Sequence, residues 1–214
     1  VSDQVFYLTP KVQNELVVRD KLSGMSVNGS LNLIQRILNN FNEKNLGMTG
    51  YPSEFGMYLS IIKINKLHKN IKGEFKFVEP EKSIKELKSL YDNFEKCIKS
   101  KDEPTSLNEL YDLFSKQPYG LKKGLIPILI TAFYMANQGS FALYNTDEQG
   151  KEFLVTEYSQ RICERFIYTP EALKIMFVKI EGQKQKLLDE FKTYVEKKYL
   201  KNIKIENPTP LNVL

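Results

Sequence analysis

A helix-then-hairpin pattern occurs twice in this chain of 214 residues and limits what the chain can fold into. Residues 52–80, PSEFGMYLSIIKINKLHKNIKGEFKFVEP, begin with apolar side chains at helical spacing and end in an alternating polar and apolar run, as in a half-buried strand. Residues 121–157, LKKGLIPILITAFYMANQGSFALYNTDEQGKEFLVTE, place two strand-like runs around a turn after an apolar helical stretch. A helix followed by a hairpin is the second half of a winged-helix unit. Two such units favour a binding or coupling module over an enzyme.

The rest of the sequence adds helices and strands around these units. Ser30, Ser83 and Ser106 are the expected N-caps of three of the helices. The charged segment KSKDEPT is the best candidate for a boundary between two halves, 1–100 and 101–214. The predicted fold class is mainly α with small β hairpins (α+β), built as tandem winged-helix-like units. Further helices are predicted over 31–45, 84–99, 107–116, 125–137, 158–166 and 183–199, and further strands over 5–8 and 172–180.

Composition is that of an ordinary globular protein with a mild positive charge. The net charge of +5 permits contact with nucleic acid without requiring it. No run of about 18 apolar residues predicts a transmembrane helix. Residues 1–9 lack the pattern of a signal peptide, so we expect a cytoplasmic protein with no membrane partner. Because the sequence starts at Val1 and ends in the loop-like NPTPLNVL, we interpret it as a piece of a longer protein.

Motifs for catalysis or cofactor binding are not found in the sequence. Cys97 and Cys163 are far apart, which is typical of buried thiols, and one histidine without a CxxC pair does not indicate structural zinc. The patterns GxxxxGK[ST], GxGxxG and GxSxG do not occur. The segment YGLKKG, residues 119–124, precedes a helix and could hold a phosphate, but a simple turn is favoured because such loops need more glycine amides. We therefore predict no catalytic residue, cofactor or metal in this chain.

Basic residues are concentrated in the first predicted wing. They alternate there with Phe75 and Phe77, and a basic wing can contact phosphates or reach a minor groove. The competing interpretation is a solvated charged face. A lone histidine in a Lys-rich loop is expected to be exposed, and either solvated or in contact with a phosphate. The residues predicted to contact a polyanion are Lys66, His68, Lys69, Lys72 and Lys76, with Lys122 and Lys123 second.

The second unit favours a protein partner. A recognition helix must expose polar side chains to base edges, whereas residues 125–135 are nearly all apolar. The following wing, NTDEQGKE, is acidic, so this unit is better suited to packing on another domain or protein. The alternative function is thus a protein-interaction scaffold that binds no nucleic acid. An enzyme would need convergent titratable groups, for which Glu54, His68 and Glu79 are the candidates.

Several segments resemble a known region of other proteins. NELVVRDKLS (14–23), GYPSEFGMYLSII (50–62) and QPYGLKKGLIPILITAF (117–133), with FALY after them, are similar to the part that follows the P-loop core in large multidomain prokaryotic ATP-binding proteins of mobile or phage-defence islands. The resemblance covers roughly residues 14–191. Ser53 and Asn145 depart from the family's pattern. The resemblance implies a non-catalytic region that couples an ATPase core, as a partner, to nucleic acid such as DNA or to another protein.

Overall fold

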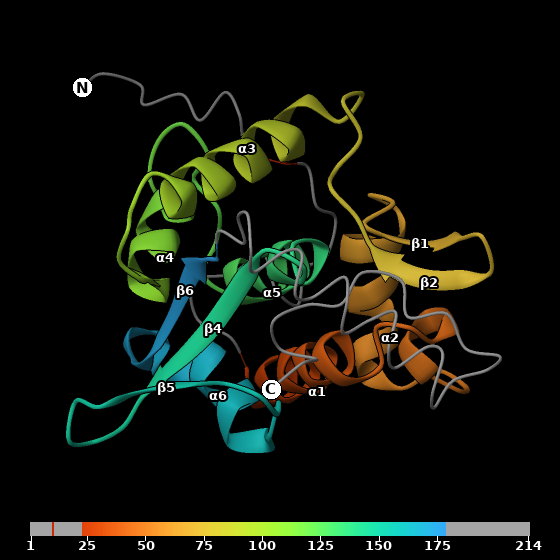
Figure 1. Cartoon of the computed structure of the whole chain (residues 1–214). Coiled ribbons are helices and arrows are strands. Elements are labelled where there is room, and N and C mark those ends of the chain that lie inside the picture. The colour runs from red at the N-terminus through yellow and green to blue at the C-terminus, as the bar shows by residue number, and fades with distance from the viewer. Residues whose placement is uncertain (1–9, 11–22, 179–214) are drawn as a thin grey trace, which may run out of the picture.

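The computed structural model describes Pro10 and residues 23–178, and the elements expected over 5–8 and 183–199 lie outside this part (Figure 1). The described chain is a mixed α/β structure with two small sheets. In chain order its elements are α1 (Gly24–Asn39), η1 (Lys44–Gly47), α2 (Ser53–Met57), η2 (Tyr58–Lys63), β1 (His68–Ile71), β2 (Glu74–Phe77), α3 (Lys85–Lys99), β3 (Thr105–Ser106), α4 (Leu107–Ser115), α5 (Ile126–Ala136), β4 (Phe141–Thr146), β5 (Glu152–Leu154), α6 (Gln160–Tyr168), η3 (Pro170–Ala172) and β6 (Leu173–Phe177).

Helix α5 is the centre of the structure. Ten of its eleven residues are buried, which confirms the prediction of a central helix that is apolar all round. It packs on α1 from the first half of the chain, on α4 from the second half, and on β2. The apolar surface that seemed available to another domain is therefore covered by α1 of the same chain. Buried side chains from both sides of the predicted boundary belong to one hydrophobic cluster.

Both predicted hairpins are present. The β1–β2 hairpin forms a sheet of its own, and the β4–β5 hairpin lies within a four-stranded antiparallel sheet of order β3-β6-β4-β5. The strand predicted over 172–180 is confirmed as β6, and it pairs beside β4, with Ile175 opposite Leu143. Residues far apart in sequence thus make the middle of this sheet.

Two of the three predicted caps are wrong. Helix α1 begins earlier than expected, because the Ser23 hydroxyl accepts a hydrogen bond from the Ser26 amide (3.2 Å) and caps the first turn. Ser30 is instead fully buried inside the helix, next to Met57 of α2. At the start of α3 the cap position is Ile84, without a side-chain bond. Ser106 does cap α4, through the amide of Asn108.

A buried ion pair joins α1 to α2. The Arg36 Nε donates to Glu54 Oε1 over 2.8 Å, and the Glu54 side chain is only 4% exposed. Burial opposes ionisation of this carboxyl, but a backbone hydrogen bond and Arg36 outweigh burial and leave the pKa of Glu54 below its usual value. Glu54, one of the three candidate catalytic groups, is therefore paired with Arg36 and ties the start of α2 to α1.

In the part of the chain that the structure describes, no helix is both long and apolar enough to cross a membrane.

The shared core leads to a first prediction. Phe133 is fully buried and contacts the rings of Tyr91, Phe94 and Phe114. We expect Phe133→Ala to lower the free energy of unfolding by about 3–5 kcal/mol, because it leaves a cavity among these rings. Chemical denaturation followed by circular dichroism measures this loss. Tyr168→Ala, at a 60% exposed position, is the control and should change it by less than about 0.5 kcal/mol. A loss below 1 kcal/mol for Phe133→Ala would contradict the packing described here.

Candidate nucleic-acid interface

The β1–β2 hairpin has one buried face and one open face. Its strands pair antiparallel with His68 opposite Phe77 and Lys69 opposite Lys76. Because side chains alternate along a strand, His68 and Phe77 share one face while Lys69 and Lys76 share the other. His68 and Phe77 are both 6% exposed and attach the hairpin to the core. In Figure 1 the hairpin projects from the side of the molecule, at the right.

The tip of the hairpin is a two-residue turn made by Lys72 and Gly73. Both have positive φ, +53° and +97°, as a hairpin turn of this length requires. The Asn70 side-chain oxygen accepts a hydrogen bond from the Gly73 amide (3.0 Å) and holds the turn. Lys72 is exposed there and makes no ion pair with any other described residue.

His68 is not the exposed histidine that the sequence predicts. Its Nε2–H donates to the Phe41 carbonyl oxygen (2.7 Å), so Nδ1 of the neutral ring accepts from the Tyr58 hydroxyl (3.0 Å). The ring also packs on Phe75 and Phe77. Burial lowers the pKa of His68, with the Phe41 hydrogen bond opposing that effect. His68 therefore positions the hairpin and does not reach a phosphate.

Glutamates hold three of the predicted lysines in place on the open side. Glu81 binds two of them, Lys66 at 2.9 Å and Lys69 at 2.7 Å, and Glu74 lies 2.9 Å from the ammonium of Lys76. The hydrogen bonds from Lys69 and Lys66 lower the pKa of the Glu81 carboxyl to about 2. These pairs are partly exposed, so each adds little to stability. The lysines are therefore held in place by acidic neighbours within the fold.

Lys122 and Lys123 lie away from the hairpin. Both are exposed in the turn that precedes α5, where the Lys122 carbonyl accepts from the Leu125 amide. Lys123 lines an open cavity of about 540 Å³ together with Glu109 and Asp112 of α4. In Figure 1, α4 lies across the molecule from β1–β2. The structure thus does not bring these two lysines together with the other five predicted residues.

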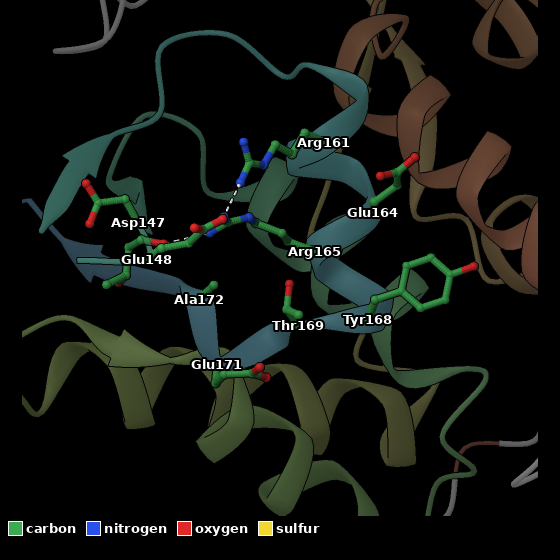
Figure 2. A pocket seen from close by; sticks show the side chains of 10 residues that line it. Asp147, Glu148, Arg161, Glu164, Arg165, Tyr168, Thr169, Glu171 and Ala172 are labelled. Atoms are coloured by element: carbon green, nitrogen blue, oxygen red, sulfur yellow. Dashed lines mark hydrogen bonds and ion pairs between the residues drawn. The ribbon is translucent and has the colours of Figure 1, made fainter. Parts of the chain in front are cut away.

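The structure contains a second charged site that the sequence analysis does not predict. Arg161 and Arg165 of α6 face the β4–β5 turn across an open cavity of about 440 Å³ (Figure 2). Arg165 Nη1 donates to the Asn145 side chain and the Thr146 carbonyl, and Arg161 lies 3.4 Å from Glu148. The spacing of the arginines, four residues apart on a helix, was the available signal. The other acidic lining residues of this cavity are Asp147, Glu164 and Glu171, which makes it a poor site for a polyanion.

Cysteine and metal chemistry receive no support within residues 23–178. Cys163 is buried, Cys97 is half-buried, and neither forms a disulfide. Burial raises the pKa of both thiols, to about 11 for Cys163, so neither is an activated thiolate. In the same range, no three His, Cys, Asp or Glu side chains are grouped as a metal site would need.

Comparison of the chain with protein-family models, with curated proteins and with solved structures found no match.

The buried state of His68 leads to a second prediction. A group whose folded pKa lies below its unfolded value of about 6.5 stabilises the fold above that pH, and the benefit is lost as pH falls toward the folded pKa. We expect stability to decrease between pH 7 and pH 5 in the wild type, and to change less in His68→Gln. Urea denaturation at each pH measures this. Glu81 and Glu54, whose pKa values are lowered from 4.5, contribute only at lower pH.

NMR provides a direct check of the same prediction. The chain has a single histidine, so its imidazole signals need no assignment by mutation. A titration midpoint above 6.5 would contradict the burial of His68.

Proposed function

We propose that this chain is a non-catalytic nucleic-acid-binding region that contacts phosphates through the β1–β2 hairpin. The observation that carries the proposal is the pairing of Lys69 directly opposite Lys76 on the open face. Like charges facing each other across strands destabilise a hairpin by roughly 0.2–1 kcal/mol. The ion pairs with Glu81 and Glu74 offset this cost only in part, because they are partly exposed, whereas a row of phosphates would stabilise both lysines.

The local charge supports the proposal. Residues 63–82 contain six lysines and three glutamates, a surplus of three positive charges, while the whole chain carries +5. More than half of the net charge is thus placed on about a tenth of the chain. Ammonium groups on a hairpin of this kind neutralise phosphates without reading bases, so binding should be strong at low salt and weakly dependent on sequence.

The proposal also includes the architecture of the chain and the kind of parent protein it belongs to. The order of helix and hairpin in α2–η2 with β1–β2, and in α5 with β4–β5, supports two winged-helix-like units, although β6 joins the second hairpin into a larger sheet. The resemblance to regions downstream of a P-loop core supports a role in coupling nucleotide state to binding. Under this proposal the parent protein carries the ATPase, in the cytoplasm, and its core is the first partner to test.

One observation favours the alternative of a protein-interaction scaffold. Ile64 is 70% exposed and Ile71 is 40% exposed, and both lie near the hairpin lysines. An acidic protein surface with an apolar centre would fit these side chains, since interface centres are typically apolar within a polar rim. A salt-resistant complex with a protein, together with no binding to nucleic acid, would support this alternative.

A third prediction tests the hairpin directly. We expect Lys69→Gln, Lys72→Gln and Lys76→Gln combined to weaken binding to a DNA oligonucleotide by about 10- to 100-fold at 0.1 M salt, because three phosphate contacts are lost. The slope of log affinity against log salt should become shallower by about 2 for a single-stranded oligonucleotide and by about 3 for a duplex. Fluorescence anisotropy across a salt series measures both.

The matched control for this variant has the same change in charge. Lys44, Lys96 and Lys151 are exposed lysines outside the hairpin, and their triple glutamine variant should bind almost as the wild type does. Equal losses in the two variants would show that net charge, and not the hairpin, governs binding.

A fourth prediction concerns Glu81, the acidic neighbour of Lys66 and Lys69. Glu81→Gln releases Lys66 and Lys69, so we expect tighter binding to the same oligonucleotide and a steeper dependence on salt. Glu109→Gln, which removes an equal charge from the ion pair with Lys101, is the control. Unchanged or weaker binding by Glu81→Gln alone would argue against phosphate contact by these two lysines.

A further inference from the structure

Tyr51 is an aromatic side chain held out in solvent. It is 92% exposed, the highest value among the exposed large hydrophobic residues in the described part of the chain. The backbone on both sides is restricted, since Gly50 has φ +70° and Pro52 is the N-cap of α2. A residue before proline is confined to extended conformations. The ring of Tyr51 is thus presented by a defined backbone.

A series of ring contacts links Tyr51 to the inward face of the hairpin, which lies opposite the face of Lys69 and Lys76. Tyr51 meets Phe55 edge-on at 5.6 Å between centroids, and Phe55 stacks on Tyr58 at 6.1 Å. Tyr58 contacts His68 at 6.0 Å, and His68 contacts Phe75 of β2 at 5.4 Å. In Figure 1, α2 and the β1–β2 hairpin lie next to each other on the same side of the molecule. The outer end of this series is open, while its middle members, Tyr58 and His68, are buried.

We infer that the hairpin surface binds single-stranded nucleic acid, with a base stacked on Tyr51 and phosphates along the hairpin lysines. This inference rests on the proposed function. Inside a duplex the faces of the bases are already stacked, so an exposed ring stacks on an unpaired base without the cost of separating base steps. Aromatic rings next to a basic surface are the combination that single-strand-binding proteins use, and stacking tolerates any base.

The surroundings of Tyr51 are compatible with a polyanion. The nearest acidic residue in sequence is Glu54, whose carboxylate is buried and paired with Arg36. Lys63, at the end of η2, is exposed and makes no ion pair with any other described residue. A nucleic-acid strand that runs from Tyr51 along α2 and η2 to the hairpin would therefore pass Lys63, and the one acidic residue of α2, Glu54, is already paired.

The test compares a single-stranded probe with a duplex of the same length. The full chain is titrated into fluorescein-labelled oligothymidine of about 12 nucleotides, and into a blunt duplex, at low salt. Tyr51→Ala should weaken binding to oligothymidine by about tenfold, which corresponds to the loss of one stacked base. Binding to the duplex should stay within about twofold. Tyr51→Phe keeps the ring and should bind as the wild type does. Tyr168→Ala removes an exposed tyrosine on α6 and is the matched control.

The outcomes separate this inference from the proposed function. If Tyr51→Ala has no effect while the triple lysine variant loses affinity, the hairpin binds phosphates and the stacking inference is wrong. Equal affinity of the wild type for duplex and single strand would also overturn it. If no nucleic acid binds even at low salt, both the stacking inference and the proposed function are wrong. As a positional readout, an oligonucleotide that carries 5-iodouracil should crosslink to Tyr51 on irradiation, and mass spectrometry identifies the crosslinked residue.

Discussion

The burial of α5 on all sides determines how the rest of the described chain is arranged. A helix with ten of eleven residues buried needs partners in every direction, and no single neighbouring element can provide them. The partners come from both halves of the sequence: α1, α4 and β2 pack on it. Because β2 is one of them, the base of the β1–β2 hairpin belongs to the core. The hairpin is thus attached to the most buried element of the molecule.

The hairpin is attached to the core through one face, and its other face points away from the core. Strand alternation places His68 and Phe77 inward and Lys69 and Lys76 outward, so the same strands fix the hairpin and display its charge. The hydrogen bonds of His68 to Tyr58 and Phe41 further restrict its movement. Lysines on a fixed hairpin lose less conformational freedom on binding than lysines on a mobile loop, which favours affinity.

Local patterns in the sequence predicted elements but not their contacts. Helices α3 and α5 and the β4–β5 hairpin follow from periodicity and turn residues, which are properties of neighbouring positions. The burial of His68 depends on Phe41, 27 residues away, and the position of β6 depends on pairing with β4. The ion pairs of Glu81 likewise join residues 12 and 15 positions apart. Such pairings result from tertiary structure, so residue types and spacing predict a basic hairpin but not which of its lysines form ion pairs.

If the hairpin binds phosphates as proposed, the carboxylate of Glu81 affects which anion it selects. It already occupies the ammonium groups of Lys66 and Lys69, so an incoming phosphate must replace it and gains only the difference between the two contacts. A lone phosphate or a free nucleotide gains little in this exchange. A polymer gains more, because it also reaches Lys72 at the tip and the exposed ring of Tyr51, where no internal partner is displaced. Under the proposed function, an internal competitor of this kind would favour a nucleic-acid strand over the small anions that surround it.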